Sequence, residues 1–299
     1  MSSNLSASAR ADVYTRITAE IIAAIESDPG SWRMPWHHHG NAIARPTNVA
    51  SGKRYRGINV LALWIAADSA RYSAGLWGTY RQWMAAGAHV RKGERATTVV
   101  LWKEYQSARD DDEGDDDGRR TRLFARAFSV FNAAQVDDYK ASKCVELEAS
   151  DQTKAADAFF AALGITASFG AYDAHYRISE DRIYMPVVGA FRDGASYAGT
   201  LLHEAAHATG AKQRLDRNFG ERFADQARAM EEAVAELTAS YVLADLGIAH
   251  HPRPDHAAYI ASWLELLKHD PRAIFTAASK AQQAADWMHA CQPAAREAA

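Results

Sequence analysis

The spacing of apolar residues along the first half of the chain predicts short helices followed by a β-hairpin. Apolar side chains recur every three or four positions over residues 11–27 and predict a helix. The largely apolar stretch 57–67 predicts a buried helix, and residues 79–86 resemble another short helix. Stretches rich in β-branched and aromatic residues predict two strands, at residues 97–105 and 121–131. Because these two strands follow each other along the chain, we expect them to pair as a hairpin.

The second half of the chain predicts mostly helices, with a few short strands between them. A helical pattern covers residues 151–163, with Asp151 as its N-cap and Gly164 as its stop. Short β-rich pieces follow at residues 165–169, 174–178 and 182–186. The last of these is expected to be an edge strand that can accept a peptide. Further helical patterns lie at residues 195–209, 225–246, 254–268 and 271–290.

Together these patterns predict an α+β fold with two domains. We expect a mixed α/β N-terminal domain over residues 1–140 and a mostly helical C-terminal domain with a small sheet over residues 150–299. A chain of 299 residues is long enough for two domains that each bury a core. An apolar share of 48% and a charged share of 24% are ordinary for globular proteins and unlike disordered ones.

The composition also indicates the cellular compartment of the protein and limits the kinds of metal site that it can form. No apolar run is long enough to cross a bilayer, and residues 1–10 lack the apolar stretch of a signal peptide. The two cysteines, Cys144 and Cys291, lie far apart and match no paired motif. This spacing argues against a disulfide framework and excludes a zinc site built from thiolates. We therefore expect a cytoplasmic protein with no membrane partner.

Charge is unevenly distributed around the net value of −3. Residues 1–106 contain thirteen Lys and Arg against seven Asp and Glu, whereas residues 141–299 contain fifteen against twenty-one. A basic first half joined to an acidic second half suggests two different tasks. Between the predicted strands, residues 107–118 contain seven acidic residues and one arginine, so we expect a flexible, solvated loop. The alternative for this loop is a role in mimicking or shielding nucleic acid.

Residues 203–207 carry the pattern His-Glu-x-x-His inside a predicted helix, which is typical of zinc metallopeptidases. Residues four apart lie on one helical face, so His203 and His207 can present ring nitrogens to one ion. Glu204 is poorly placed to ligate beside the two histidines. It suits the general base that takes a proton from the attacking water. We therefore expect one Zn²⁺ ion in the second half.

The third metal ligand is expected on the next predicted helix. Glu232 and Glu236 are four residues apart and share a face beside Ala233 and Leu237. This pair resembles the gluzincin arrangement, in which a Glu one helix later ligates the metal and an acid four residues further on orients a ligating histidine. We expect Glu232 to ligate and Glu236 to orient a histidine, with Glu231 as the alternative ligand. The competing interpretation puts all three acids on a solvated helix face.

The basic first half is also rich in aromatic residues. Six of the eight tryptophans fall within residues 32–102, where arginines, lysines and tyrosines are interleaved with them. Cations that follow phosphates beside rings that stack on bases are what single-stranded nucleic acid requires. The residues expected to contact it are Arg45, Lys53, Arg54, Tyr55, Arg56, Trp77, Tyr80, Arg81, Trp83, Arg91 and Lys92. Tryptophans packed into a core and cations on a solvated surface are the alternative explanation.

Short stretches spread over nearly the whole chain form a distinctive set. They lie at residues 12–14, 32–36, 52–60, 77–83, 90–94 and 128–132, and again at 203–207, 231–237 and 259–264. This set resembles the ArdC antirestriction family. The resemblance implies an N-terminal domain that binds single-stranded DNA and a C-terminal zincin-like metallopeptidase domain. It also implies a plasmid-encoded protein that protects incoming conjugative DNA from restriction. If the metal site is active, tethering it to DNA would direct it at proteins on that DNA, such as restriction-enzyme subunits.

Two rival hypotheses stay open at this point. One is a non-catalytic protein that binds single-stranded DNA, or assists replication, and whose zinc is only structural. A related N-terminal region in plasmid primases gives this hypothesis its basis. The other is an ordinary peptidase with an incidental basic surface, which would cleave peptides without any help from residues 1–140.

Overall fold

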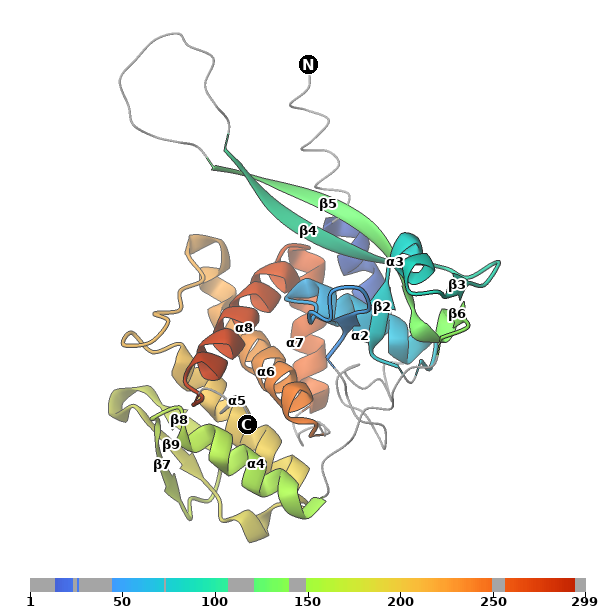
Figure 1. Ribbon diagram of the computed structural model, residues 1–299. Helices are drawn as coiled ribbons and strands as arrows, with labels where there is room; N and C mark the ends of the chain where they lie inside the picture. The colour runs from blue at the N-terminus through green and yellow to red at the C-terminus, as the bar shows by residue number, and fades with distance from the viewer. Residues whose placement is uncertain are drawn as a thin grey trace, which may run out of the picture.

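A four-stranded sheet of order β1-β2-β5-β4 forms the framework of the first half of the chain (Figure 1). This computed structural model describes residues 14–23, 26, 45–72, 74–106, 121–139, 149–248 and 256–293. The long strands β4 (Thr97–Gln106) and β5 (Thr121–Asn132) pair antiparallel, from Thr97 opposite Val130 to Gln106 opposite Thr121. This pairing confirms the predicted hairpin. The acidic run 107–118 lies outside the described residues.

The remaining strands of the first half are very short. β2 (Leu76–Gly78) pairs antiparallel with β5, and β1 (Thr47–Asn48) pairs parallel with β2. A separate ladder joins β3 (His89–Val90) to β6 (Val136–Asp137). Strands of two or three residues are too short to show an alternating pattern, so they could not be predicted from the sequence.

Helix α2 (Ile58–Ser69) is buried against this framework. Most of its side chains are apolar and buried, Trp64 among them. Asn59 at its start exchanges two hydrogen bonds with the backbone of Val100 in β4, at 2.8 and 2.7 Å. Residues 14–23 are also helical, and α3 (Tyr80–Ala85) is the third predicted helix of the first half.

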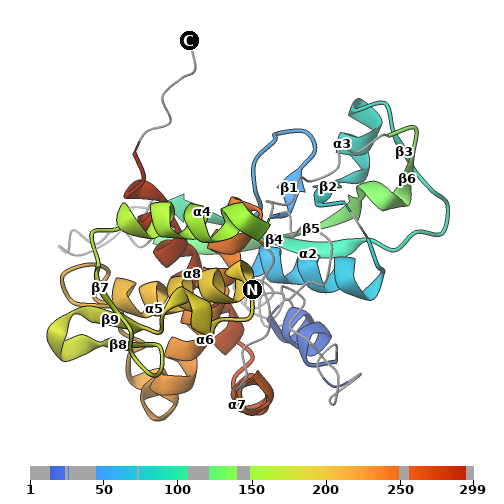
Figure 2. The same cartoon turned by 90° about the horizontal axis from the view of Figure 1, so that it is seen from below.

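The second half begins with helix α4 and a small three-stranded sheet. α4 (Ala149–Ala161) starts before Asp151, which therefore lies in the first turn and is not the N-cap that the sequence predicted. β7 (Thr166–Phe169), β8 (His175–Arg177) and β9 (Arg182–Met185) form the sheet in the order β7-β9-β8. The prediction that the last strand lies at the edge was therefore wrong. β9 is central and β8 is an edge strand (Figure 2).

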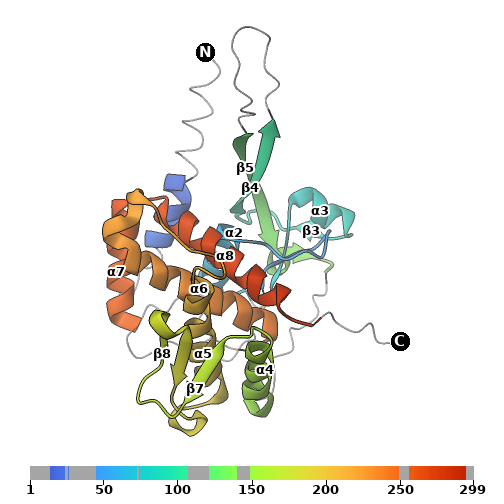
Figure 3. The same ribbon diagram turned by 90° about the vertical axis from the view of Figure 1, so that its left-hand side faces the viewer.

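Four further helices make up most of the second half (Figure 3). They are α5 (Gly194–Thr209), α6 (Ala227–Leu246), α7 (His256–His269) and α8 (Ala273–Ala290), close to the predicted ranges. α5 packs against α4 and α6, and α6 packs in turn against α8. Across the described ranges, no helix combines the length and the apolar character needed to span a membrane.

The two halves share their main hydrophobic core. Ile17 of the N-terminal helix and Leu61 of α2 are buried in one cluster with Leu201 of α5 and Val242 of α6. The fold is α+β, as predicted, with sheets in the first half and a mostly helical second half that contains a small sheet. The domain boundaries near residues 140 and 150 stay a prediction, because the connecting residues 140–148 lie outside the described part of the chain.

A buried carboxylate ties the first half to the last helices. The side chain of Asp245, near the end of α6, is 2% exposed and pairs with Arg45 at 2.9 Å, Arg54 at 2.8 Å and His289 at 2.9 Å. The Arg45 guanidinium also lies over the ring of Tyr241, with Cζ 4.5 Å from the ring centroid. Burial alone would raise the pKa of Asp245, but the hydrogen bond from His289 and the charges of Arg45 and Arg54 lower it. Asp245 therefore stays charged inside the protein.

Replacing Arg45 with methionine is expected to lower the free energy of unfolding by about 3–5 kcal/mol, because buried Asp245 would lose an equally buried partner. Arg54→Met is the matched control. It removes a cation from the same carboxylate, but the Arg54 side chain is 53% exposed. Its loss should therefore cost less than about 1 kcal/mol. Urea unfolding at neutral pH, followed by circular dichroism, measures both. Equal losses of unfolding free energy in the two variants would contradict the importance of burial for this ion pair.

Candidate metal centre

Helix α5 places both histidines of the His-Glu-x-x-His pattern on one face. The helix begins where the Asp193 carboxylate accepts a hydrogen bond from the Ser196 amide at 2.7 Å. His203 is 1% exposed and Glu204 is 6% exposed. The Nε2 atoms of His203 and His207 lie 3.1 Å apart, and the two rings are inclined at 78°. Both imidazoles therefore face one position in space.

Glu232 of α6 completes the group. Its Oε2 lies 3.5 Å from Nε2 of His203 and 3.6 Å from Nε2 of His207. Ligands that lie about 2.0–2.1 Å from a tetrahedral zinc ion are separated from one another by about 3.3 Å. The three observed separations bracket that value, so the donor atoms suit a single divalent ion. His203, His207 and Glu232 are thus the candidate metal site of the described chain, and they are the three residues that the sequence singled out.

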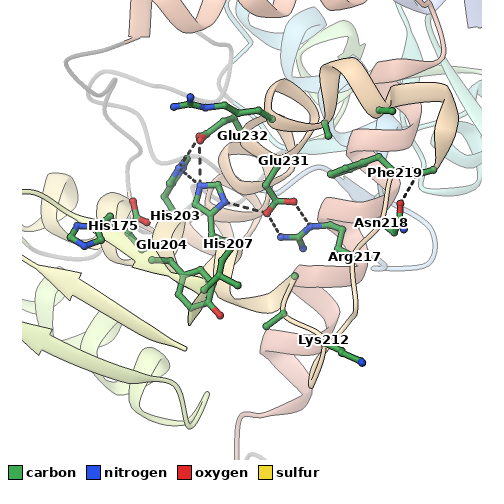
Figure 4. Close-up of a pocket in the computed structure, with 18 of the residues that line it drawn as sticks. His175, His203, Glu204, His207, Lys212, Arg217, Asn218, Phe219, Glu231 and Glu232 are labelled. Carbon is green, nitrogen blue, oxygen red and sulfur yellow. Dashed lines mark hydrogen bonds and ion pairs between the residues drawn. The ribbon is translucent and has the colours of Figure 1, made fainter. Parts of the chain in front are cut away.

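A carboxylate also lies behind each histidine. Oε2 of Glu236 is 3.4 Å from Nδ1 of His203. Oε1 of Glu231 is 3.2 Å from Nδ1 of His207 (Figure 4). A carboxylate at the outer nitrogen fixes the ring orientation and leaves Nε2 for the metal. Glu236 lies beside His203 on the predicted helix, and its role in orienting that histidine stays a prediction. Glu231, the alternative ligand, faces the outer nitrogen of His207, so the geometry favours Glu232 as the third ligand.

Arg217 holds Glu231 from the other side. Its guanidinium donates to both carboxylate oxygens, through Nε at 2.7 Å and through Nη2, and it also donates to the Ala206 carbonyl at 3.0 Å. Burial opposes ionisation of Glu231, but hydrogen bonds from Arg217 and His207 lower its pKa to about 2. No sequence motif marks Arg217. The one local signal is Gly210, where a Cβ atom would lie 2.7 Å from the Arg217 guanidinium.

The surrounding carboxylates favour positive charge at this site. Burial alone would lower the pKa of His207, but hydrogen bonds with Glu231 and Glu232, together with the charges of Glu204 and Glu232, raise it to about 9. A divalent cation can satisfy the same carboxylates in place of the proton, as metal binding at histidines generally requires. The donor set therefore fits a metal both in geometry and in charge.

The site opens on a cleft of ≈ 860 Å³. Edge strand β8 contributes His175 and Tyr176 to its lining, and the segment between α5 and α6 contributes Lys212 and Phe219. His175 lies on the side of Glu204, across from Phe219 (Figure 4). Its ring stacks on Tyr184, with centroids 5.0 Å apart. No sequence motif marks His175, because strand pairing is what brings it to the cleft.

Three of the residues expected to contact DNA are buried, which corrects that expectation for them. Arg45 is 6% exposed and paired with Asp245, while Trp77 and Trp83 are 1% and 0% exposed. Trp77 belongs to a hydrophobic cluster, and Trp83 donates from Nε1 to the Phe131 carbonyl at 2.9 Å. A buried ring cannot stack on a base. For these two tryptophans the alternative explanation, a place in the core, is the right one.

Seven of the other eight expected residues are exposed, and Tyr55 is half-buried. Lys53 lies in the turn after β1, and Tyr80 and Arg81 begin α3. Asn48 joins these two regions through hydrogen bonds to Tyr55 and Gln82, both at 3.1 Å. Three of the cations already have acidic partners: Arg54 pairs with Asp245, Arg56 with Asp286 and Arg91 with Glu94.

Two families match adjoining parts of the chain. The family described as the N-terminal domain of anti-restriction factor ArdC matches residues 11–131. The family described as a zincin-like metallopeptidase matches residues 154–280, which include the whole candidate metal site. The two matches fall on either side of the region where the sequence predicted a domain boundary.

Individual relatives extend over nearly the whole chain. Uncharacterized protein y4eC of Sinorhizobium fredii is 53% identical over 284 residues, which cover 94% of this chain and 92% of that protein. A DNA primase TraC of Escherichia coli is 36% identical over 296 residues, which cover 92% of this chain but 27% of the primase. The chain therefore matches about a quarter of this longer relative.

Two solved structures are also similar to nearly the whole chain. The metal-free crystal structure of antirestriction ArdC protein from the R388 plasmid superposes with a TM-score of 0.77 and 36% identity, covering 94% of this chain and 97% of that one. Its Mn(II)-bound structure superposes with a TM-score of 0.73 and covers 95% and 99%.

Glu231→Gln is expected to weaken metal binding by about 10–100-fold, because a neutral amide would no longer fix the outer nitrogen of His207. Glu232→Gln should weaken it further, since that change removes a ligand. Glu221→Gln, at an exposed acid just before α6, is the control. Calorimetric titration of the metal-depleted protein with Zn²⁺ measures all three. A larger loss in Glu231→Gln than in Glu232→Gln would reverse the assignment of the third ligand.

Proposed function

This chain belongs to the ArdC antirestriction family, with an ArdC N-terminal domain followed by a zincin-like metallopeptidase domain, and from this premise we propose that it is a DNA-binding metallopeptidase. The first half binds single-stranded DNA. The second half holds one zinc ion through His203, His207 and Glu232, and Glu204 acts as the general base in peptide-bond hydrolysis. In the cell, the protein protects incoming conjugative plasmid DNA from restriction by the recipient.

One observation carries the catalytic part of this proposal, namely that three donor atoms converge beside an open cleft. The atoms of His203, His207 and Glu232 all lie within 4.8 Å of one another. A structural zinc site is usually closed by four protein ligands, whereas a catalytic site has three and keeps one position open. The described residues supply three, and the cleft of ≈ 860 Å³ gives a substrate access to them.

The chain's own residues have distinct roles in this hydrolysis. When bound, the metal supplies Lewis-acid chemistry, which polarises a carbonyl group and makes water easier to deprotonate. Glu204 takes the proton from the attacking water and passes it to the amine nitrogen that leaves. Glu236 and the Glu231–Arg217 pair keep the two imidazoles in orientation. The edge of β8 aligns an extended peptide through main-chain hydrogen bonds.

The donor set favours zinc as the resident ion. Two imidazoles and one carboxylate are a known ligand set of catalytic zinc sites. Zinc also binds nitrogen and oxygen donors more tightly than Mn²⁺. A relative has been crystallised with Mn(II), so elemental analysis of the purified protein is needed to identify the ion that it carries.

Support for single-strand binding comes from charge and from exposed side chains in the first half. Lys53, Arg81 and Lys92 are exposed cations, and among the described residues none of them is held in an ion pair. Tyr80 is 50% exposed beside Arg81 and can stack on an unpaired base. The antirestriction role follows from family membership. A protease tethered to DNA would act on proteins bound to the same DNA, restriction-enzyme subunits among them.

A non-catalytic accessory role in replication is the second candidate. The observation in its favour is that two Escherichia coli proteins named DNA primase TraC contain regions 36% and 34% identical to this chain. The matched regions are 27% and 19% of those proteins, so priming itself is not carried over. In this second role the metal would stabilise the fold without any hydrolysis.

Glu204→Gln separates the two candidates. It is expected to lower the rate of cleavage of fluorescent casein by about 100- to 10,000-fold, because the attacking water loses its general base. Metal content, thermal stability and DNA affinity should stay unchanged, and protection in a conjugation assay should be lost. Full protection by a folded, metal-loaded Glu204→Gln protein would support the accessory role.

The DNA-binding proposal predicts a marked dependence on salt. Lys53→Gln and Arg81→Gln should each weaken binding of labelled oligothymidine and reduce the slope of log K against log salt by about 0.7. Lys154→Gln on α4 is the control, since it removes another exposed lysine that lies outside the proposed contact residues. Fluorescence anisotropy across a salt series measures all of them. Equal affinity for a duplex of the same length, or a flat salt dependence, would contradict the proposal.

A further inference from the structure

A second pocket lies where the first half meets helix α8. Its volume is ≈ 630 Å³, and it shares no lining residue with the metal cleft. We call it the seam pocket. The first half contributes Tyr14, Arg56 and Trp102, and α8 with its N-cap contributes Arg272 and Lys280. α8 runs beside α2, close to the β4–β5 ribbon (Figures 1 and 3).

One wall of the seam pocket is aromatic. The ring centroid of Tyr14 lies 5.6 Å from that of Trp102 and 4.5 Å from that of Phe275. Tyr14 and Trp102 are only half-buried, so part of each ring faces the pocket. Arg272 lies over the Tyr14 ring, with Cζ 5.3 Å from the centroid. The Tyr14 ring is inclined at 37° to Trp102 and at 69° to Phe275, so the rings form a tilted aromatic cluster that offers exposed ring surface to a flat ligand.

The other wall is a polar face of α8. The lining positions recur every three or four residues, which places them on one side of the helix: Arg272, Thr276, Ser279, Lys280 and Gln283. The opposite side of α8 consists largely of buried alanines. The helix therefore presents hydroxyl, amide and cationic groups to the pocket while its other side packs into the core.

The pocket carries net positive charge. Its lining contains three cations, Arg56, Arg272 and Lys280, against one acid, Asp286, which pairs with Arg56. Arg272 and Lys280 form no ion pair with any residue that the structure describes. Two cations without acidic partners among the described residues, beside an aromatic cluster, suit a ligand that is both anionic and aromatic.

We infer that the seam pocket binds one nucleotide unit of single-stranded DNA. The base stacks on Trp102 and Tyr14, and Arg272 and Lys280 hold its phosphate. The volume falls within the range of about 300–1,000 Å³ that is usual for small-ligand pockets. A paired base cannot enter without leaving its duplex, so the pocket selects single strands. This inference rests on the proposed DNA binding and extends the DNA surface onto the metallopeptidase half.

Charge variants on α8 test the inference in the full-length, metal-loaded protein. Arg272→Gln and Lys280→Gln should each weaken oligothymidine binding by about 5-fold and lower the salt slope by about 0.7. Trp102→Leu should weaken it by about 10-fold and Trp102→Phe by less, because phenylalanine still stacks. Melting temperatures check that the variants fold. Lys154→Gln is the control for a lost surface charge.

A direct readout does not depend on substitutions. Photo-crosslinking of an oligonucleotide that contains 5-iodouracil, followed by mass spectrometry, should attach the base to Tyr14, Trp102 or Phe275. Crosslinks confined to the turn near Lys53 and to α3 would overturn the inference. Polyglutamate should compete poorly with the oligonucleotide for binding. If it competed as well as oligothymidine does, the seam pocket would be a general anion site.

The outcomes separate this inference from the proposed function. If Lys53→Gln weakens binding while Arg272→Gln and Lys280→Gln behave like Lys154→Gln, the seam pocket is not part of the DNA surface and the proposed DNA binding stands. If the unaltered protein binds no oligothymidine, the proposed DNA binding fails and the seam pocket fails with it.

Discussion

The close packing of α5 against α6 is the constraint on which the rest of the second half depends. Small buried residues on both helices, such as Ala205, Ala206, Ala233 and Ala235, allow the backbones to approach closely. This approach lets one carboxylate from α6 reach the position that two imidazoles of α5 already face. Because both helices are buried in the main core, packing holds the donor atoms in place.

Helix α6 also links the metal site to the first half of the chain. Glu231, Glu232 and Glu236 lie at its metal-binding end, and Asp245 near its other end holds Arg45 and Arg54 from the first half. The acidic residues of the second half therefore have two separate structural roles, one at the metal site and the other in ion pairs with the first half. Likewise, some cations of the first half form ion pairs inside the protein. The net positive charge counted from its sequence is therefore larger than the positive charge that is available to contact DNA.

The proposed function combines DNA binding and metal-dependent peptide hydrolysis in one folded unit. The proposed DNA-binding surface extends to α8, and α8 packs directly against α6, the helix that carries Glu232. A protein bound to the same DNA would meet the cleft at a raised effective concentration, without needing high affinity for the cleft itself. Such an arrangement explains why a metallopeptidase domain and a DNA-binding domain would occur in one chain.

The sequence by itself determined the helices, the β4–β5 hairpin and the shared helical face of His203 and His207, because helical and strand periodicities arise between residues a few positions apart. From its resemblance to the gluzincin arrangement it also proposed Glu232 as the third ligand, with Glu231 as the alternative, and the geometry favours Glu232. Tertiary structure decided the edge position of β8 and, with it, the place of His175 in the cleft. It also brought Arg217 to Glu231 and buried Arg45, Trp77 and Trp83. Each of these depends on contacts between residues distant along the chain, which local patterns cannot encode.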